Sequence, residues 1–574
     1  MAIRTEVDLQ VEQCARTLSP PPNQQPNFLQ GLQLWLVGFG LSLALFLTAL
    51  EVSIVSTALV TMTDELQGFS QSSWVVTAYL LTYTGFMMIW SKCGDIFGVK
   101  PSLLASLAFF IAFSGGCGAV QSMTALIICR AFQGTGAAGV NSLTFFGLLR
   151  LLPESKFDLT ASLASTVMAL SLMLGPLVGG AINETGDWRW VFLLNLPAGA
   201  LAWLLLLVTM PSHYPYLRPQ ARSNATEESD KNWIWTLIAA VHFISAKQKA
   251  FFSQVDFPGA SLVLAASMLL IAALQEGNLS YGWSSPVIIT FFVISGVLWI
   301  AFFTWEWLLS RHAATNRTTK IQPMLPWRLT QNRVFLGVAL GFFLIGASIT
   351  LCIIGLPQRY QTVHGSTPLS AGVRLLAYAI AQPIGSFITS LSAGRLRVPF
   401  IFILIASIII QIVGHFLLST TPTTTHLWVG HYGYAILAGL GVGMALAAVY
   451  MMAPLVVAEA DQSIAVGTGL QLRMLGSALG LAVATTVLNA RLKGALPALL
   501  VDEAAGVEEV MESTRGIQAL SDGARQGVRQ VFGEAYNLQM KIAGGFSAAQ
   551  ILTALLIWKR EGQVRYLKEE ARGA

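Results

Sequence analysis

The chain has 574 residues, of which 54% are apolar and only 11% are charged. A soluble protein carries about 25% charged residues, so this composition excludes a soluble protein of several domains with charged surfaces. The five cysteines form no CxxC pair, and neither a disulfide framework nor a metal site is expected.

Fourteen apolar stretches account for most of the chain. A membrane-spanning helix needs roughly 20 apolar residues, and continuous apolar runs favour helices over the alternating strands of a barrel. We therefore predict an all-α polytopic membrane protein. The predicted spans are 33–60, 71–90, 101–121, 124–149, 160–182, 190–210, 257–275, 286–309, 334–356, 369–392, 399–419, 430–457, 464–490 and 542–558.

The basic residues predict which side of the membrane each loop faces. The tails and the loops assigned to the cytoplasm contain 23 lysines and arginines, whereas the short outer loops contain two, Arg189 and Arg359. Because cytoplasmic loops are enriched in basic residues, we expect both termini in the cytoplasm, with residues 1–31 as a polar tail rather than a cleavable signal. This bias explains the net charge of +5 without a nucleic-acid partner.

The first span contains an acidic residue, Glu51, about 27 Å from the start of the helix at a rise of 1.5 Å per residue. An ionisable group inside a membrane normally faces a cavity or a partner and marks a transport pathway. A carboxyl group removed from water can bind and release a proton, which favours a role in proton coupling. The alternatives are a structural pair with an arginine and exposure at the outer interface.

The loop between the second and third spans, residues 91–101, combines Asp95, Gly98 and Lys100. An acidic residue at a helix end, a glycine for a tight turn and a basic residue can form a latch on the cytoplasmic side. An ordinary polar turn is the alternative interpretation.

Arg130 lies six residues into the fourth span. A charge inside a span costs roughly 2.5 kcal/mol or more, so we expect this side chain to face a cavity or a partner, unless it reaches the outer interface. The glycines that follow, Gly134, Gly136 and Gly139, match the spacing GxGxxG. No strand precedes them, so a dinucleotide site is rejected, and close helix packing is predicted instead.

The fifth span contains a run of glycines around a proline, with the sequence GPLVGG at residues 175–180. Proline removes a backbone hydrogen bond and permits a bend, and the glycines permit close packing. A hinge and a packing face are both consistent with this pattern, and both suit a protein that alternates between two shapes.

Residues 231–252 are aromatic and moderately apolar, but they contain His242 and several lysines. We interpret them as an amphipathic helix on the cytoplasmic face. If they crossed the bilayer instead, the chain would have fifteen spans and every later loop would change sides, against the basic-residue bias.

Several of these motifs together resemble the major facilitator superfamily. They are DIFGVK at 95–100, RAFQGTGAA at 130–138 and GPLVGG at 175–180. The segment around Glu51, WRWVFLLNLP at 188–197, LPQRYQTVHG at 356–365 and SAGV at 370–373 are similar to the fourteen-spanner drug:proton antiporter branch, which includes fungal toxin and multidrug efflux pumps.

The resemblance implies a major facilitator fold with two six-helix bundles and two extra transmembrane helices. The expected divisions are a cytoplasmic tail at 1–31, an N-terminal bundle at 32–210, a cytoplasmic linker with the amphipathic helix at 211–255, the two extra helices at 256–309, a second linker at 310–332, a C-terminal bundle at 333–559 with a long, partly helical outer loop at 491–541, and a cytoplasmic tail at 560–574.

The resemblance also implies proton-coupled export of a small amphipathic organic compound by alternating access. The expected proton-coupling residues are Glu51 and Arg130. The expected gating residues are Asp95, Gly98, Lys100, Gly175, Pro176, Gly179 and Gly180. The expected substrate-binding residues are Tyr79, Tyr83, Gln133, Asn141, Arg374, Tyr378 and Gln382. Arg374 and Arg473 are buried charges of the C-terminal half, which either contact an anionic cargo or brace helices.

Other functions remain open at this stage. An importer of siderophores or sugars can use the same fold, although the glycine–proline motif favours export. A membrane-bound enzyme or receptor is disfavoured, because no nucleophile elbow, metal cluster or soluble domain is found. No GxxxxGK[ST] motif is present, so ATP is not the direct energy source. We expect no cofactor, the proton gradient as energy source, and a monomer surrounded by lipid in the plasma membrane. Asn278 lies in a candidate glycosylation sequon in a short outer loop.

Overall fold

The protein is an all-helical bundle in the part of the chain that the computed structural model describes. The described residues are 29–66, 72–149, 151–152, 157–185, 187–211, 256–277, 281–315, 323, 325, 327–424, 427–458, 461–500, 520–559 and 564. Among them, the extended structure consists of one isolated bridge between Gly277 and Tyr281. The predicted amphipathic helix at 231–252, the sequon asparagine Asn278 and both predicted tails, apart from a few terminal residues, lie outside this part.

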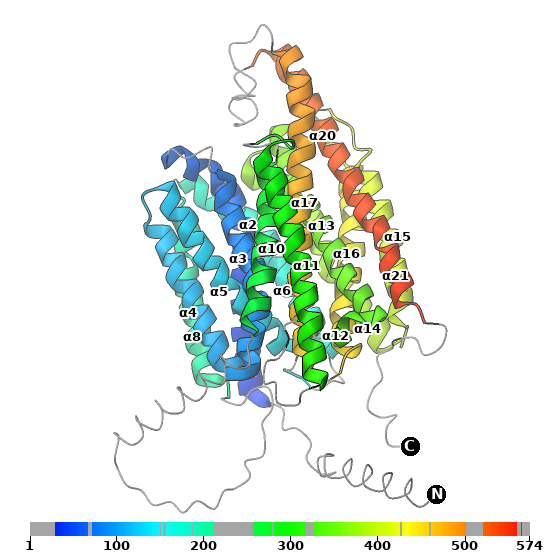
Figure 1. The fold of residues 1–574 in the computed structure, drawn as a ribbon. Helices are drawn as coiled ribbons and strands as arrows, with labels where there is room; N and C mark the ends of the chain where they lie inside the picture. Colours follow the sequence, from blue (N-terminus) through cyan, green and yellow to red (C-terminus); the bar gives the residue numbers. More distant parts are fainter. Residues whose placement is uncertain are drawn as a thin grey trace, which may run out of the picture.

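The N-terminal half is built from seven helices of the described chain. They are α2 (Gly31–Glu65), α3 (Ser72–Phe97), α4 (Val99–Ala119), α5 (Met123–Leu149), α6 (Phe157–Thr185), α7 (Trp190–Leu193) and α8 (Asn195–Thr209). Within this half α3 and α4 pack on α5, α2 packs on α6, and α8 packs on α2 and α4. Figure 1 shows these helices side by side, from blue to cyan.

The C-terminal half has a similar set of helices. They are α13 (Arg333–Thr362), α14 (Pro368–Gly394), α15 (Phe400–Leu418), α16 (Gly430–Leu455), α17 (Gln462–Leu499), α20 (Asp522–Ala549) and α21 (Ile551–Ile557). Here α14 and α15 pack on α16, α13 packs on α17, and α20 packs against α13, α15 and α17.

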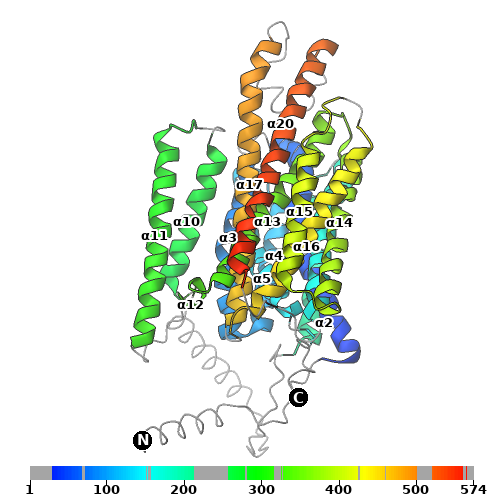
Figure 2. The ribbon, with the colours of Figure 1, turned by 90° about the vertical axis from the view of Figure 1, so that its right-hand side faces the viewer.

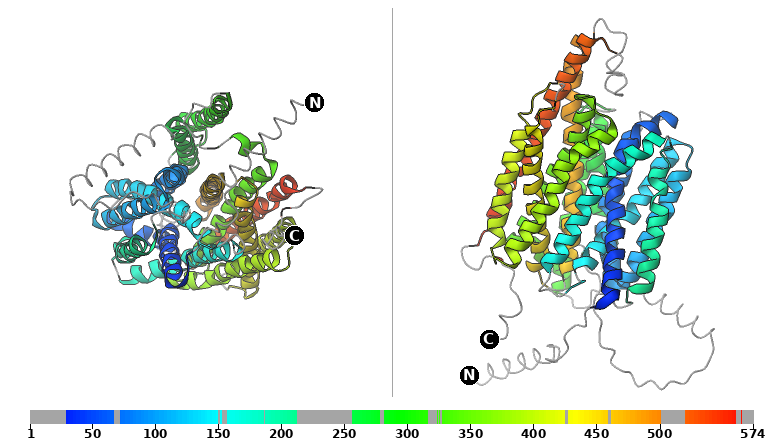
Figure 3. Two further views of the ribbon diagram at one scale, coloured as in Figure 1. Left: turned by 90° about the horizontal axis from the view of Figure 1, so that it is seen from below. Right: turned by 180° about the vertical axis from the view of Figure 1, so that it is seen from behind.

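The two halves meet along two helix pairs. Helix α14 packs against α6, and α17 packs against α3. The view from behind in Figure 3 shows α14 and α6 side by side at this boundary. The largest cluster of buried apolar side chains draws on both halves, so the halves share one core.

Two further helices stand at one side of this body. Helix α10 (Phe257–Glu276) packs on α3 and α17, while α11 (Pro286–Thr315) packs chiefly on α10. Figure 2 shows the pair at the edge of the molecule, with the short α12 (Trp327–Thr330) below it. Asp256 caps α10 by accepting a hydrogen bond from the Gly259 backbone N–H and ties it to α11 through the indole N–H of Trp305, which donates to the same oxygen.

The described helices fit a protein that crosses a membrane many times. Eleven of them are long and apolar enough to span a bilayer, and large apolar side chains cover their outward faces, for example Val293, Val297 and Ile300 on α11. This distribution is the reverse of a soluble surface and defines a multi-pass membrane protein. Each predicted span falls on helical residues, although 190–210 is divided between α7 and α8 and 542–558 between α20 and α21. Helices α3, α5 and α6 are not among the eleven.

The helices α17 and α20 extend well into the predicted outer loop at 491–541. Helix α17 continues to Leu499, and α20 begins at Asp522 after the N-cap Ser521. Figures 1 and 2 show both ends projecting beyond the other helices. The extensions are stable as helices because apolar side chains at helical spacing pack between them, among them Leu492, Leu496 and Phe532.

Candidate functional site

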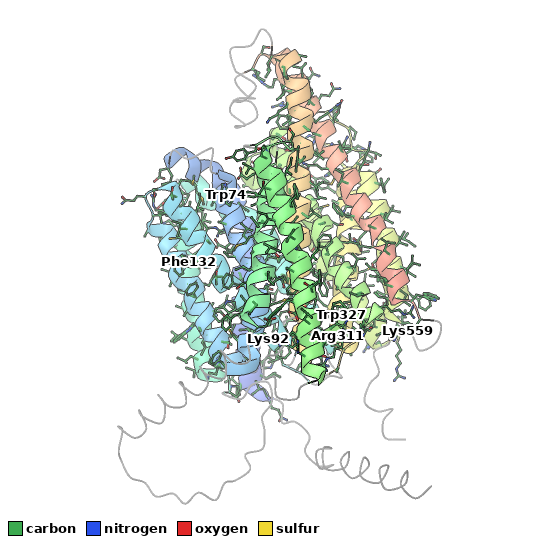
Figure 4. The ribbon with its side chains drawn as sticks, in the orientation of Figure 1. Trp74, Lys92, Phe132, Arg311, Trp327 and Lys559 are labelled. Atoms are coloured by element: carbon green, nitrogen blue, oxygen red, sulfur yellow. The ribbon has the colours of Figure 1, made fainter. Side chains whose placement is uncertain are left out.

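A buried ion pair joins the first and fourth long helices. Arg130 on α5 places Nη1 2.5 Å from Oε1 of Glu51 on α2, and both side chains are only 1% exposed. The next residue but one, Phe132, points outward from the bundle and is 46% exposed (Figure 4). The face of α5 that carries Arg130 is therefore turned inward, and Arg130 does not reach the outer interface.

The Arg130 guanidinium is held by more than its charge. Nη1 also donates to Gln133 Oε1 at 2.7 Å, and Nε donates to the Val75 carbonyl at 3.1 Å. Its carbon lies 4.2 Å from the centre of the Tyr79 ring, a favourable cation–π distance. These contacts fix the arginine in one orientation.

The second carboxylate oxygen of Glu51 has its own donor. Asn195 Nδ2, at the start of α8, donates to Glu51 Oε2 at 2.6 Å. Gln133 Nε2 donates to Ser114 Oγ on α4 at 2.7 Å, so the network connects α2, α4, α5 and α8. A buried pair pays for its desolvation only when such further hydrogen bonds are present, and here both carboxylate oxygens are occupied.

Glycines allow the helices around this network to approach closely. A Cβ on Gly134 would lie 2.4 Å from the Tyr79 carbonyl oxygen of α3, and one on Gly136 would lie 2.5 Å from the Phe110 amide nitrogen of α4. Neither position has room for a side chain. The GxGxxG run of α5 is thus a packing surface, as its place in an apolar helix predicts.

A cavity of about 70 Å³ lies between the two halves. Its wall comes from α2, α3 and α6 on one side and from α13 and α17 on the other. The lining residues are Ala49, Val52, Ser53, Val76, Leu80, Tyr83, Met168, Ile349, Thr350, Ile353, Ile354, Arg473, Met474, Ser477 and Leu481. The wall is mostly apolar with a few polar groups, which is the usual character of a small-molecule site.

The predicted substrate-binding residues are distributed over four places. Tyr83 lines the cavity, whereas Tyr79 and Gln133 surround the buried ion pair. Asn141 is buried on α5, and neither atom of its amide has a hydrogen-bond partner. The remaining three, Arg374, Tyr378 and Gln382, lie on α14 and do not line the cavity.

The predicted gating residues lie at helix ends and at the contact of α2 with α6. Gly98 has a φ of 98°, which favours glycine, and joins α3 to α4. Lys100 donates to the Leu207 and Met210 carbonyls at the end of α8. A Cβ on Gly175 would lie 1.9 Å from Ser53 Oγ. Gly179 and Gly180 are buried on α6, and the side chains of Asp95 and Pro176 lie outside the described part.

A partly exposed cluster connects the C-terminal end of α2 to the start of α7. Arg189 Nη1 donates to Glu65 Oε1 at 2.6 Å, and Trp188 Nε1 donates to Glu65 Oε2 at 2.7 Å. Hydrogen bonds from Arg189 and Trp188 lower the pKa of Glu65 below its ordinary value of 4.5. This clamp holds the Trp-Arg-Trp segment, which has the composition of an interfacial anchor.

Several side chains at these sites were not among the functional residues predicted from the sequence. Asn195 and Ser114 complete the ion-pair network, and Met168, Thr350 and Ser477 line the cavity. Asn195 belongs to the motif at 188–197, which was the available signal for it. The others are small or apolar residues in apolar helices, and the sequence around them carries no distinguishing pattern.

Two helical halves that enclose a cavity, with a buried ion pair beside it, define the architecture of a secondary transporter. The family model described as "Major Facilitator Superfamily" matches residues 41–311. An MFS-type transporter of Fusarium mangiferae, FPY5, is 38% identical over 550 residues, which cover 96% of this chain and 88% of the relative. The chain belongs to the major facilitator superfamily and is a transporter of small molecules, not an enzyme.

Further relatives and solved structures agree with this assignment. Multidrug resistance protein 3 of Bacillus subtilis is 30% identical over 71% of this chain and 70% of its own length. The aspyridones efflux protein of Neocamarosporium betae is 27% identical over 83% of this chain and 78% of its own length. A bacterial homologue of the human lysosomal transporter Spinster has the same fold, with a TM-score of 0.54 at 15% identity, covering 92% of this chain and all of that one.

Proposed function

We propose that this transporter exports small amphipathic organic compounds, such as toxins or drugs, in exchange for protons. Two of the relatives described above carry efflux or multidrug resistance in their names. A largely apolar cavity with few polar groups suits compounds of this kind.

The observation that carries the proposal is the small cavity between the halves. Its volume of about 70 Å³ is well below the roughly 300–1,000 Å³ of a site for a drug-sized ligand. A cargo of that size requires the halves to separate, which is the motion of alternating access. Arg374, Tyr378 and Gln382 on α14, with Asn141 on α5, are proposed to join the wall in the widened state.

Proton coupling is assigned to Glu51 and Arg130. A protonated Glu51 no longer attracts the guanidinium, so proton binding weakens the connection between α2 and α5. The same turns of α2 carry Ala49, Val52 and Ser53 in the cavity wall. Protonation at Glu51 can therefore change the wall that the cargo touches, which links the two events.

The gate is assigned to the helix ends and to the α2–α6 contact. Lys100 holds the end of α8 against the start of α4, and we propose that this connection and Asp95 control the cytoplasmic opening. Gly175 and Pro176, with Gly179 and Gly180, are proposed to let α6 bend as the halves separate.

The proposed topology has fourteen crossings with both termini in the cytoplasm. Fourteen of the described helices have 15 residues or more, and the basic residues favour this orientation. The divisions given by the sequence, the plasma membrane as location and a monomeric state belong to the same proposal.

Inside-out vesicles provide the test. A panel of amphipathic probes includes anionic fluorescein derivatives and cationic ethidium. We expect uptake of at least one of them only when the vesicle lumen is acidic, and collapse of that uptake with a protonophore. Vesicles from cells without the protein are the control. Uptake that instead required an acidic exterior would indicate proton-coupled import and contradict the proposed direction.

A further inference from the structure

A buried arginine lines the central cavity, and no carboxylate among the described residues forms an ion pair with it. Arg473 on α17 is 4% exposed and lines the cavity that both halves enclose. The backbone of Arg473 lies about 16 Å along the axis of α17 from the first residue of that helix, at a rise of 1.5 Å per residue. This distance places Arg473 near the middle of a bilayer core of about 30 Å. It is the charged residue among those that line this cavity.

The nitrogens of Arg473 are poorly satisfied compared with those of the other buried arginines. Its Nε and Nη2 have no hydrogen-bond partner, and within the described residues no carboxylate forms an ion pair with it. Arg130 pairs with Glu51, and Arg359 donates to Asn537 Oδ1 and two carbonyls at the end of α15. A buried charge without a partner is costly, so an anion at this place would be strongly favoured.

The backbone around Arg473 is fixed by close helix packing. A Cβ on Gly346 of α13 would lie 2.1 Å from the Arg473 carbonyl oxygen, and one on Gly476 would lie 1.9 Å from the Phe343 carbonyl oxygen. Ser477 Oγ donates to the Gly346 carbonyl at 3.2 Å. Because α13 and α17 are locked together here, the arginine is held at the cavity rather than directed to a membrane surface.

Two tyrosine hydroxyls lie near Arg473. Tyr83, across the cavity on α3, is fully buried with an unpaired hydroxyl, and it lies within electrostatic reach of Arg473. The hydroxyl of Tyr450 on α16 donates to Met168 Sδ at 3.9 Å and also lies within hydrogen-bonding and electrostatic reach of Arg473. A guanidinium with phenolic donors beside it is suited to bind an acidic group, while Val52, Leu80 and the isoleucines of α13 suit an apolar body.

We propose that the cargo is an organic anion, an apolar compound with one acidic group that binds Arg473. This inference rests on the proposed export function and adds the chemical class of its substrate. It assigns Arg473 to recognition of the cargo rather than to bracing of helices.

The test uses the purified full chain and three aromatic probes of similar size: 2-naphthoate, neutral 2-naphthamide and cationic 2-naphthylmethylammonium. Binding is measured by isothermal titration calorimetry. We expect 2-naphthoate to bind at least roughly tenfold more tightly than the other two, and Arg473→Gln to remove that preference. Arg473→Lys should restore part of it, because the charge returns without the planar fork.

The control is Arg333→Gln, which removes a positive charge from the exposed start of α13 and should leave the preference unchanged. Thermal unfolding separates recognition from bracing: without ligand, Arg473→Gln should be at least as stable as the parent, because an unpaired buried charge is gone. A marked loss of stability in this variant would overturn the inference in favour of bracing.

Two further outcomes would overturn the inference. One is equal binding of the three probes. The other is chloride that, compared with gluconate buffer, stabilises the protein as strongly as 2-naphthoate, which would assign Arg473 to an inorganic anion. Gradient-driven uptake of neutral and cationic probes alone would support export while rejecting an anionic cargo. Absence of any uptake would reject the export function, and the binding measurements alone would then decide whether Arg473 binds an organic anion.

Discussion

Glu51 and Arg130 form a buried ion pair between α2 and α5, and Ala49, Val52 and Ser53, which lie close to Glu51 on α2, form part of the central cavity wall. The Glu51 carboxylate therefore lies on the same turns of α2 as the cavity wall but does not itself line the cavity that the cargo is proposed to enter. This proximity makes Glu51 the residue through which protonation and cargo binding are proposed to act on each other.

We expect Glu51→Gln to abolish proton-driven efflux while the protein still folds. Glutamine keeps one acceptor oxygen, which can serve Arg130 or Asn195 but not both, and it cannot exchange a proton. Thermal stability should fall by less than the about 3–5 kcal/mol lost when a buried pair is broken by truncation. Transport in inside-out vesicles and thermal unfolding of the purified protein measure the two effects.

The matched control for this substitution lies on the same helix. Glu65→Gln makes the same chemical change at the partly exposed C-terminal end of α2, and its efflux should match that of the parent. Undiminished efflux in Glu51→Gln would remove this residue from the mechanism.

Gly175→Ala should impair transport by separating α2 from α6. The added Cβ would lie 1.9 Å from Ser53 Oγ and 2.9 Å from the Ile54 amide nitrogen, so the α2 backbone has to move. Because Ser53 lines the cavity, this movement would also change the shape of the cavity wall. We expect reduced efflux and a lower midpoint of thermal unfolding.

Gly296→Ala provides the comparison for Gly175→Ala. A Cβ at Gly296 on α11 meets no atom within 4 Å. Alanine is favoured over glycine in a helix by about 0.5–1 kcal/mol, so this variant should be as stable as the parent or slightly more stable, with normal efflux. Equal damage from both alanines would show that the loss of a helical glycine, and not the α2–α6 contact, decides the outcome.

The Glu65–Arg189 clamp should stabilise the protein only above acidic pH. The pKa of Glu65 is lowered in the folded protein, so its contribution is fully present above the unfolded pKa near 4.5 and is lost as the pH falls through the lower folded pKa. Because both side chains are partly exposed, the effect should stay under about 1 kcal/mol.

Thermal unfolding at two pH values checks this dependence. Glu65→Gln should be slightly less stable than the parent at pH 7, and the deficit should shrink as the pH falls below 4.5 and disappear once the parent carboxyl is itself protonated. A deficit that persisted unchanged at the acidic pH would mean that charge is not the cause.

The long helices could be predicted from the sequence because lipid requires continuous apolar surface, and the predicted spans coincide with them. The partly helical region at 491–541 was harder to delimit. Its acidic and small residues indicate a loop, whereas Leu492, Leu496 and Leu500 repeat every four residues, a helical signal that the composition obscures.

The candidate site could be predicted only in part. A charge in an apolar run is conspicuous, so Glu51 and Arg130 were identified, and a pair was one of the alternatives. Which face of a helix meets the cavity is harder to predict, because in a membrane both the lipid face and the packed face are apolar. For this reason the three residues of α14 were expected at a cavity that they do not line, whereas Arg473 does line it.

The proposed topology predicts that both chain ends face the same side of the membrane. Epitope tags at the two termini should be accessible to antibody only after the cell is permeabilised. Two single cysteines test the interior of the chain with an impermeant maleimide: Asp522→Cys, at the exposed start of α20, should react from outside, and Arg333→Cys, at the start of α13, only after permeabilisation. Tags on opposite sides would require an odd number of crossings, and the segment at 231–252 would then be the first candidate for an additional span, because it is aromatic and moderately apolar.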